Sequence, residues 1–445
     1  MQNAMKTKDL RQEQYLEKLF AELKIDMVNR MDLRHDLNDE EVLDIIEEII
    51  LTKSFDQYLT IQERKNLADR VFNSIRRLDV IQPLIEDAGI SEIMVNGYEN
   101  IFIERNGRVL KTELAFENIE KLEDVIQSIV SKVNRTVNES TPIVDARLQD
   151  GSRVNVVLRP VALDGPVLTI RKFPEKPMSI ERLLNFKSMD LEMASFLQTL
   201  VKARYNIFIS GGTGSGKTSL LNAIANLIPL EERVITIEDS AELQLKTLKN
   251  LVRLETRNAN TEGKGQIDMG SLIKTSLRMR PDRIILGEVR DGPAAYYMLQ
   301  SMNTGHDGSL TTGHANSARD MLSRLETMVL SAETLPLEAI RQQIASAIDV
   351  IIHLSRLRDG SRKIVEISEL DGLKEGQIVL NTIFRFAESN PIHQADCENI
   401  EEIRITPDEP VVGQFFHTGN KMKNNMKMKH AGLFSQYVSW EDSLQ

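Results

Sequence analysis

Apolar residues recur at helical spacing in the first part of the chain. After polar residues at positions 38–41, isoleucine, leucine and valine return every three or four positions, which predicts an amphipathic helix. The same spacing over residues 64–78 predicts a second helix. Such a stripe is typical of a buried core or of a face that packs on a partner helix, so we do not interpret it as a ligand site. The apolar residues of the first helix are Val42, Leu43, Ile45, Ile46, Ile49 and Ile50.

Between residues 90 and 115 the apolar positions fall on every second residue, which predicts β-strands. The dipeptides Asn96-Gly97 and Asn106-Gly107 favour tight hairpin turns, so this region is expected to form a small antiparallel meander. Residues 117–134 return to helical spacing, and residues 143–173 alternate again. The mixture predicts an α+β domain.

Two prolines, Pro174 and Pro177, mark a change in the pattern. Proline fixes φ and lacks a backbone donor, so this segment is predicted to be a linker rather than a helix or a central strand. From about residue 180 to 355, apolar strands alternate with helices, which is the pattern of a parallel α/β sheet, and 360–386 reads as closing strands. The predicted divisions are a helical N-terminal extension (1–64), an α+β domain (65–173), a linker (174–180), an α/β domain (181–386) and a C-terminal tail (387–445).

Composition limits the class of protein. Apolar residues make up 41% of the 445 residues and charged residues 27%, which is typical of a globular protein and argues against overall disorder. The sequence contains neither an apolar run long enough to span a bilayer nor an N-terminal apolar segment typical of a signal peptide. The single cysteine, Cys397, fits a reducing cytoplasm. A net charge of −11 argues against a chain built to coat nucleic acid, so we expect no direct nucleic-acid binding, with a local basic patch as the alternative.

The most informative motif is Gly-Gly-Thr-Gly-Ser-Gly-Lys-Thr, which satisfies the phosphate-binding pattern G-x-x-x-x-G-K-[ST]. An apolar strand precedes it and an apolar helix follows it, as the motif requires. Glycines let backbone N–H groups surround a phosphate, and the helix N-terminus adds positive partial charge. The lysine reaches the β- and γ-phosphates of ATP and the threonine hydroxyl serves Mg²⁺. The motif residues are Gly211, Gly212, Thr213, Gly214, Ser215, Gly216, Lys217 and Thr218.

Three further strands end in polar residues. Glu238 follows one apolar run, Glu288 follows a second and His314 follows a third. Because ligands of α/β sheets bind beyond the carboxyl ends of the strands, we expect these side chains to converge on the phosphate loop. Nucleoside triphosphate hydrolysis needs carboxylates for Mg²⁺ and water, and a histidine can contact the γ-phosphate. We assign Glu288 to the Mg²⁺ and water side and Glu238 to polarisation of water.

These segments together resemble one family. GGTGSGKT, ITIEDSAEL, LRMRPDRIILGEVR and GHDGSLTTGHANSARDMLSRLE are similar to the Walker A, Asp, Walker B and His boxes of the type II/type IV secretion ATPases. GISEIMVNG and TPIVDARLQDGSRVN resemble the CpaF-type branch, which serves tight-adherence (Flp-type) pili and related secretion machines. The resemblance covers about residues 65–386. Gly287 stands where many P-loop enzymes have the Walker B aspartate, which leaves direct Mg²⁺ ligation by Glu288 an open question.

The resemblance implies a hexameric ring of bilobed subunits. It implies a PAS-like N-terminal domain and a RecA-like P-loop domain that hold ATP and Mg²⁺ between them, with ring motions that act on an inner-membrane platform protein. It also implies arginines from the N-terminal domain at the phosphates, and Arg147, Arg153 and Arg171 match best. A two-residue hairpin at Asp150-Gly151 would turn Arg147 and Arg153 to opposite sides, whereas a three-residue loop, 150–152, would put them on one face.

The main functional hypothesis is an ATP-hydrolysing motor for pilus assembly or protein secretion, cytoplasmic and peripheral to the inner membrane. One alternative is a conjugative type IV secretion ATPase, and another is a nucleotide-binding regulatory scaffold without significant turnover. The C-terminal tail carries lysines among methionines, and we predict a solvated tail there, with contact to acidic lipid or a partner loop as the alternative. These lysines are Lys421, Lys423, Lys427 and Lys429.

Overall fold

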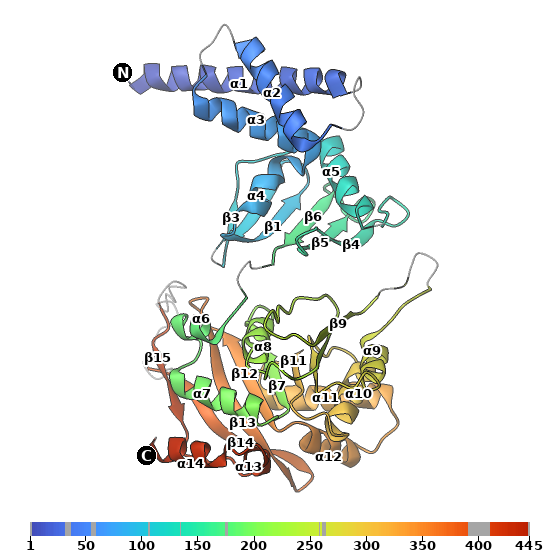
Figure 1. The fold of residues 1–445 in the computed structure, drawn as a ribbon, viewed down its shortest axis with the longest axis vertical. Helices are drawn as coiled ribbons and strands as arrows, with labels where there is room; N and C mark the ends of the chain where they lie inside the picture. Colours follow the sequence, from blue (N-terminus) through green and yellow to red (C-terminus); the bar gives the residue numbers. More distant parts are fainter. Residues whose placement is uncertain are drawn as a thin grey trace, which may run out of the picture. The chain divides into compact units, whose positions relative to one another are not determined.

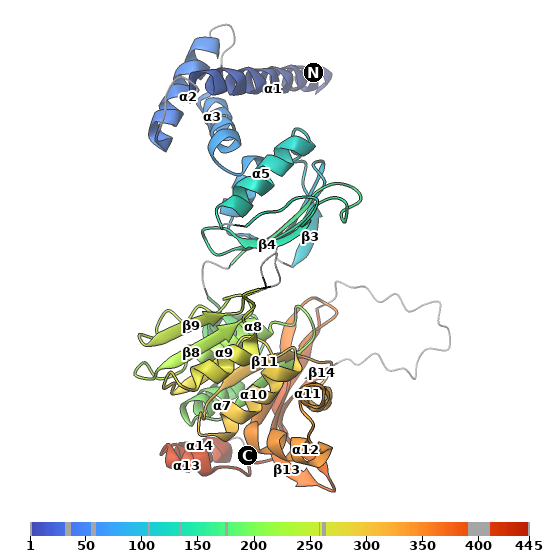
Figure 2. The same ribbon diagram turned by 90° about the vertical axis from the view of Figure 1, so that its right-hand side faces the viewer.

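The chain forms two compact units, residues 1–175 and 176–445 (Figures 1 and 2). The structure is a computed structural model. The residues that it describes are 2–31, 37–54, 59–105, 107–133, 135–173, 177–257, 259, 264–389 and 410–443. Among them, none of the helices combines the length and the apolar character that crossing a membrane requires.

The first unit begins with three helices, α1 (Gln2–Met31), α2 (Asp39–Lys53) and α3 (Ile61–Arg76). Helices α2 and α3 each start at a capping box, in which a polar side chain and a glutamate three residues later satisfy each other's backbone N–H groups. The predicted apolar stripe is confirmed, because it packs into a core shared by the three helices (Figure 1). Its buried members in α2 are Val42, Ile46, Ile49 and Ile50.

The rest of the first unit is a six-stranded antiparallel sheet with the order β3-β2-β1-β6-β5-β4. Alternate residues of the strands face a core that helix α5 (Ile119–Ser131) covers, so the predicted α+β arrangement is confirmed. A short 3-10 helix, η2 (Asp79–Ile81), and α4 (Gln82–Glu86) lead into the sheet. The strands are β1 (Ile90–Asn96), β2 (Asn100–Arg105), β3 (Arg108–Lys111), β4 (Ile143–Arg147), β5 (Arg153–Val157) and β6 (Val167–Arg171).

The second unit is built on a nine-stranded sheet with the order β15-β14-β13-β12-β7-β11-β10-β8-β9. The strands from β12 to β9 are parallel to their neighbours, and β13, β14 and β15 add antiparallel strands at the β12 edge. The order β12-β7-β11-β10-β8 is the 5-1-4-3-2 arrangement of a RecA-like core, which confirms the predicted α/β fold. The strands are β7 (Ile207–Gly211), β8 (Val234–Glu238), β9 (Leu251–Glu255), β10 (Arg283–Leu286), β11 (Leu310–His314), β12 (Val350–Arg356), β13 (Arg362–Lys374), β14 (Gln377–Glu388) and β15 (Gly413–His417).

Helices cover both faces of this sheet. One core cluster joins the sheet to α6 (Ile180–Asn185), α7 (Leu191–Lys202) and α8 (Lys217–Ala225). The other cluster joins the opposite face to a second set of helices (Figure 1). This second set is α9 (Met269–Ser276), α10 (Gly292–Asn303), α11 (Ala318–Ala332) and α12 (Leu337–Ala347). A parallel sheet that is buried on both faces explains why its strands are apolar throughout rather than alternating.

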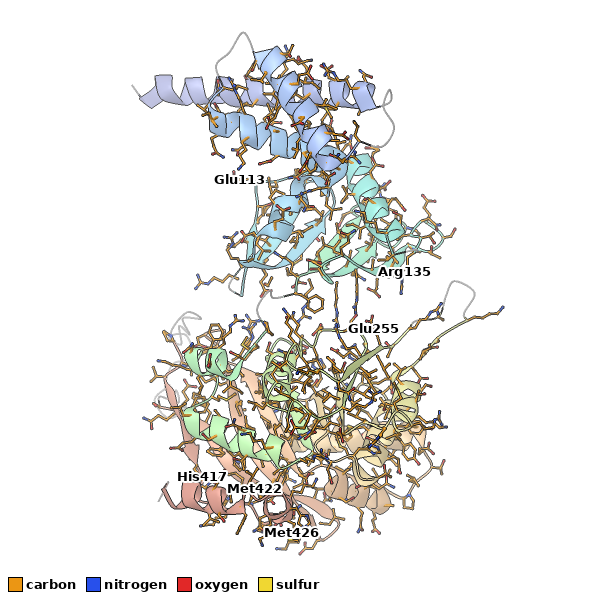
Figure 3. The ribbon with its side chains drawn as sticks, viewed as in Figure 1. Glu113, Arg135, Glu255, His417, Met422 and Met426 are labelled. Atoms are coloured by element: carbon orange, nitrogen blue, oxygen red, sulfur yellow. The ribbon has the colours of Figure 1, made fainter. Side chains whose placement is uncertain are left out.

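The C-terminal segment departs from the prediction of a solvated tail. Figures 1 and 2 both place α13 (Met426–His430) and α14 (Phe434–Ser443) beside α7. Met422, labelled in Figure 3, and Met428 are buried in the same core cluster as α7. The lysines between them stay nearer the surface, and Lys427 pairs with Asp349 at 2.7 Å. The alternation of lysine and methionine is therefore the mark of a half-buried segment, and the prediction was wrong for 421–429.

Candidate functional site

The phosphate loop connects β7 to α8, as the motif requires. Gly216 caps the N-terminus of α8 with φ at +97°, a conformation that strains other residues. At Gly211 the limit is space, because a Cβ atom would lie 2.5 Å from the Leu354 carbonyl oxygen and 2.6 Å from Ser215 Oγ. These two positions therefore require glycine, and a glycine loop that leads into a helix N-terminus is the arrangement that directs backbone N–H groups toward an anion.

Lys217 lies across this loop. Its Nζ donates to the carbonyl oxygens of Gly211 at 3.1 Å and Gly212 at 2.8 Å, and it lies 3.1 Å from Nδ1 of His314. The side chain is buried, and burial lowers the pKa of Lys217 while the nearby Glu288 carboxylate opposes that shift. The ammonium group is thus held at the mouth of the loop by weak carbonyl partners, which phosphate oxygens can replace.

His314 connects the loop to the next acidic residue. Strand β11 pairs directly with β7, with His314 opposite Gly211, so the strand register itself brings the imidazole to the lysine. On its other side, His314 Nε2 lies 2.7 Å from Glu288 Oε1. Because an ammonium group can only donate, Nδ1 accepts from Lys217 and the proton of the neutral ring is on Nε2. The contact of Nε2 with Glu288 Oε1 is short but lacks the geometry of a hydrogen bond. Burial lowers the pKa of His314 while the Glu288 carboxylate opposes that shift, and the net effect favours the neutral ring.

Glu288 is fixed from both sides. The carbonyl of Gly287 accepts from Thr312 Oγ1 at 2.7 Å, and the N–H of Val289 donates to the Thr312 carbonyl at 2.9 Å. The residues that flank Glu288 are therefore tied to the strand that carries His314. The carboxylate Oε2 accepts from Arg290 through Nε at 2.9 Å and Nη2 at 2.6 Å.

Arg290 extends the chain of charges to the adjacent strand end. Its Nη1 lies 3.2 Å from Oδ2 of Asp239, the residue that follows β8. Sequence reasoning assigned no role to Arg290 or Asp239. Their positions in the sequence could have indicated them, because each lies close to a candidate acid at the end of a parallel strand. Asp239 directly follows Glu238, and Arg290 comes two residues after Glu288. Lys217, His314, Glu288 and Arg290 form one continuous series of polar contacts.

Glu238 ends β8 and is buried at 2% exposure. Its Oε2 accepts the backbone N–H groups of Glu242 at 2.7 Å and Leu243 at 3.0 Å. Its Oε1 is buried and makes no hydrogen bond within the described part of the chain. Burial raises the pKa of Glu238, and the two backbone hydrogen bonds oppose that shift. Such a buried oxygen without a protein partner calls for a partner from outside the chain, such as a water molecule.

The structure also accounts for the glycine at position 287, where many P-loop enzymes have an aspartate. A Cβ atom at this position would lie 3.0 Å from Cγ and 3.3 Å from Cβ of Glu238. The neighbouring strand β8, paired in parallel with β10, thus supplies the side chain that fills this space. The acidic side chain in this space is therefore that of Glu238, which lies directly against Gly287.

The residues present fit ATP with Mg²⁺. The glycine loop, Lys217 and the N-terminus of α8 are donors for phosphate oxygens, and Thr218 lies in the first turn of α8, where its hydroxyl can reach a metal bound to those phosphates. Among the described residues, no group of three or more histidine, cysteine or acidic side chains could hold a metal ion by itself. These residues are compatible with a Mg²⁺ ion that binds together with the phosphates of the nucleotide. Arg362 Nε also donates to the Gly214 carbonyl at 2.8 Å, a contact that the motif did not predict.

The three predicted arginines lie in the first unit and form a row across its sheet. Arg147 pairs with Arg153, and Arg153 pairs with Arg171. Directly opposed residues of an antiparallel sheet point to the same face, and the next residues along two of the strands, Val154 and Ile170, are buried in the core. The arginines therefore share the face away from α5. Their role at a phosphate stays a prediction.

The hairpin that joins β4 and β5 decides between the two loops considered above. The N–H of Leu148 donates to the Ser152 carbonyl at 2.9 Å, which leaves residues 149–151 as a three-residue loop. This loop begins one residue earlier than the predicted 150–152, yet it preserves the parity that puts Arg147 and Arg153 on one face. The arrangement with opposite faces is excluded.

Residues 76–403 match the family described as "Type II/IV secretion system protein". The chain is 30% identical over 330 residues to the type IV secretion system protein VirB11 of Bartonella quintana, covering 66% of this chain and 92% of that protein. It is 35% identical over 293 residues to the conjugal transfer protein TrbB of Rhizobium radiobacter, which covers 65% of this chain and 86% of TrbB.

Two further matches differ in extent. An uncharacterized protein of Methanocaldococcus jannaschii is 39% identical over 275 residues, which is 60% of this chain and 38% of that protein, so the chain spans well under half of that relative's length. The crystal structure of the VirB11 ATPase from the Brucella suis type IV secretion system, in complex with sulphate, is 30% identical. The alignment with that structure covers 65% of this chain and 92% of the VirB11 chain, with a TM-score of 0.36. Because the family match extends over more than half of its length, the chain belongs to the type II/IV secretion system protein family.

Proposed function

We propose that this protein is an ATP-hydrolysing motor subunit that powers pilus assembly or type II-like protein secretion. The observation that supports this most directly is the contact series from Lys217 through His314 to Glu288 at the rim of the parallel sheet. A module that only bound nucleotide would need the glycine loop and Lys217. The placement of an acid and a neutral imidazole beside that loop supports hydrolysis.

In the proposed mechanism, the loop N–H groups and Lys217 bind the β- and γ-phosphates, and Lys217 exchanges its carbonyl partners for phosphate oxygens. Mg²⁺, when bound, neutralises phosphate charge, and Thr218 with Glu288 would hold it. Glu288 orients the attacking water and accepts its proton, and Arg290 keeps that carboxylate in place. Neutral His314, which lies between Lys217 and Glu288, would report the state of the γ-phosphate to β11 through these two residues.

Glu238 has a separate part in this proposal. Its Oε2 is held by two backbone N–H groups, so the carboxylate cannot rotate freely, and Oε1 remains to accept a hydrogen bond from water. This geometry supports the polarisation of water that the sequence suggested. The Glu238 side chain lies against Gly287, the residue before Glu288.

The arginine row of the first unit would complete the site. A guanidinium group neutralises charge on the γ-phosphate in the transition state, and three of them on one face of a rigid sheet can act together. We propose that Arg147, Arg153 and Arg171 have this role and that nucleotide state changes the angle between the two units of the chain.

The biological setting follows from family resemblance. We propose a homo-hexamer of the CpaF type that works in the cytoplasm, peripheral to the inner membrane, on a membrane-embedded platform protein. We propose no direct contact with nucleic acid, because the net charge of the chain is −11.

The decisive experiment measures phosphate release with Mg²⁺ and ATP. The wild-type protein is expected to hydrolyse ATP, and Lys217→Ala is expected to lose hydrolysis while its circular dichroism spectrum and melting temperature stay close to wild type. Glu288→Gln is expected to bind nucleotide with little turnover. Full activity in Lys217→Ala would refute the site, and a wild-type protein that binds ATP without releasing phosphate would favour the regulatory scaffold.

A second candidate function is a conjugative type IV secretion ATPase, which is favoured by the names of two relatives, VirB11 and TrbB. It shares the chemistry proposed above and differs in the client. Co-purification from the native host separates the two, because a pilus motor is expected with a platform protein and pilins, and a conjugative ATPase with a coupling protein and a relaxase.

A further inference from the structure

A buried histidine lies beneath the phosphate loop and has no part in the mechanism above. His353 is on β12, which pairs in parallel with β7, and it stands opposite Ser210, the residue before Gly211. Its exposure is 7%, and Ser210 is fully buried. Ile351, on the same face of β12, belongs to the apolar core under α10–α12. An imidazole in such a place costs free energy unless both of its nitrogens have partners.

The partners of His353 come from two different segments. Its Nδ1 lies 2.9 Å from Ser210 Oγ, and the ring also forms a hydrogen bond with the backbone of Asn316. That backbone bond raises the pKa of His353, as expected for a carbonyl acceptor, although burial has the larger effect and lowers it. Ser210 Oγ also lies 3.3 Å from the Ile352 carbonyl oxygen, a longer contact than the 2.9 Å to Nδ1. In the neutral tautomer with its proton on Nε2, Nδ1 accepts from the serine hydroxyl and Nε2–H donates to the Asn316 carbonyl.

These two segments are the ones that carry the reactive groups. Ser210 leads directly into the phosphate loop and Lys217, whereas Asn316 follows His314 by two residues. Between them, His314 is held at its own position by the pairing with Gly211, and the N–H of Ala315 donates to the Gly211 carbonyl at 3.4 Å, a long hydrogen bond. The contact of His353 with Asn316 lies beyond Ala315 and limits how far the segment after His314 can move away from the phosphate loop.

We propose that His353 is a positioning residue that fixes the distance between the phosphate loop and His314 through its contacts with Ser210 and Asn316. This inference rests on the proposed ATP hydrolysis. It concerns geometry in the active state rather than nucleotide affinity, because His353 lies under the loop and its ring is turned to protein groups. Small displacements of reacting groups lower rates steeply, by up to about 100-fold for 1 Å.

The test compares kcat, KM and nucleotide affinity in the full chain. His353→Phe keeps the ring volume and removes both hydrogen bonds, and it is expected to lower kcat about tenfold while the Kd for a fluorescent ADP analogue stays within about twofold. His353→Gln keeps a group at the Nε2 position and His353→Asn keeps one at the Nδ1 position, so partial recovery by either identifies the contact that matters. Ser210→Ala removes one partner with little change in volume and covers the case in which the phenylalanine variant does not fold.

A matched control is His417→Phe, which removes an imidazole from β15 of the same unit, where it packs edge-on against Phe384. It is expected to leave kcat unchanged. The diagnostic measurement is a double-mutant cycle with His314→Ala. If His353 acts through His314, His353→Phe costs little further activity once His314 is gone, whereas a general loss of packing lowers activity equally in both backgrounds.

The outcomes separate cleanly. A kcat of His353→Phe equal to that of wild type, or an equal effect with and without His314, overturns this inference and leaves the proposed hydrolysis intact. A wild-type protein without hydrolysis overturns the proposed function and this inference with it. A selective loss of kcat that disappears in the His314→Ala background supports the positioning role.

Discussion

Replacing Gly287 with alanine tests the packing of the two acidic strand ends against each other. The added Cβ would approach Glu238 Cγ to 3.0 Å and Cβ to 3.3 Å, whereas carbon atoms prefer separations of about 3.5–4.0 Å. Neither atom is the free end of a flexible chain, because the carboxylate of Glu238 is held by the N–H groups of Glu242 and Leu243. Glu238 must therefore move, and the overlap cannot be relieved at small cost.

The expected size follows from this overlap. Gly287 is half-buried and its new methyl group would press on the buried Glu238 side chain. Overpacking costs about 1–3 kcal/mol, so the free energy of unfolding is expected to fall by this amount in chemical denaturation. Displacement of the Glu238 carboxylate is expected to lower kcat about tenfold or more, with little effect on binding of ADP to the glycine loop. Gly89→Ala is the matched control, because its Cβ meets only the carboxylate end of Asp87, at 3.2 Å.

A second substitution makes the reasoning refutable. Glu238→Ala removes the Cγ atom that the new methyl group would contact, so Gly287→Ala is expected to cost less stability in that background than in wild type. The same cost in both backgrounds would show that the contact with Glu238 is not the cause. Unchanged stability and kcat in Gly287→Ala alone would refute the account of this position.

Three further predictions concern charges. Arg290→Gln removes two charge-assisted hydrogen bonds from Glu288 and is expected to lower kcat about tenfold in a phosphate-release assay while the melting temperature stays close to wild type. Glu232→Gln leaves the fully buried Arg283 guanidinium without its carboxylate and is expected to lower the free energy of unfolding by about 3–5 kcal/mol in urea denaturation. Lys427→Ala removes the cation 2.7 Å from buried Asp349 and is expected to cost about 1–3 kcal/mol in the same assay, with nucleotide affinity unchanged.

The sequence predicted those parts of the molecule that depend on local pattern. The alternation of strands and helices gave the α/β fold, and the rule that ligands bind beyond the carboxyl ends of parallel strands placed Lys217, Glu288 and His314 at one rim. The glycine motif indicated its own chemistry because its spacing is tied to backbone geometry.

Features that depend on strand register or on long-range packing could not be read from the sequence. The contact of His353 with Ser210 requires β12 and β7 to pair with these residues opposite each other, and their separation of 143 residues carries no signal of this. The reason for a glycine at position 287 could be found only from the structure, because it depends on where the Glu238 side chain of the neighbouring strand lies. The burial of Met428 was missed because interleaved lysines lower the local hydrophobicity of a segment that covers a core with one face only.

The docked C-terminal segment matters for anyone who shortens this protein. The family match ends at residue 403, before β15 begins at Gly413, so a version trimmed to that match would lack β15, α13 and α14. It would uncover the ring of Phe196, which packs 6.3 Å from that of Tyr437, and would strip Tyr205 of its bond to the Asn424 carbonyl. Poor solubility of such a fragment would then result from the newly exposed apolar surface around α7. It would not show that the fragment lacks catalytic activity.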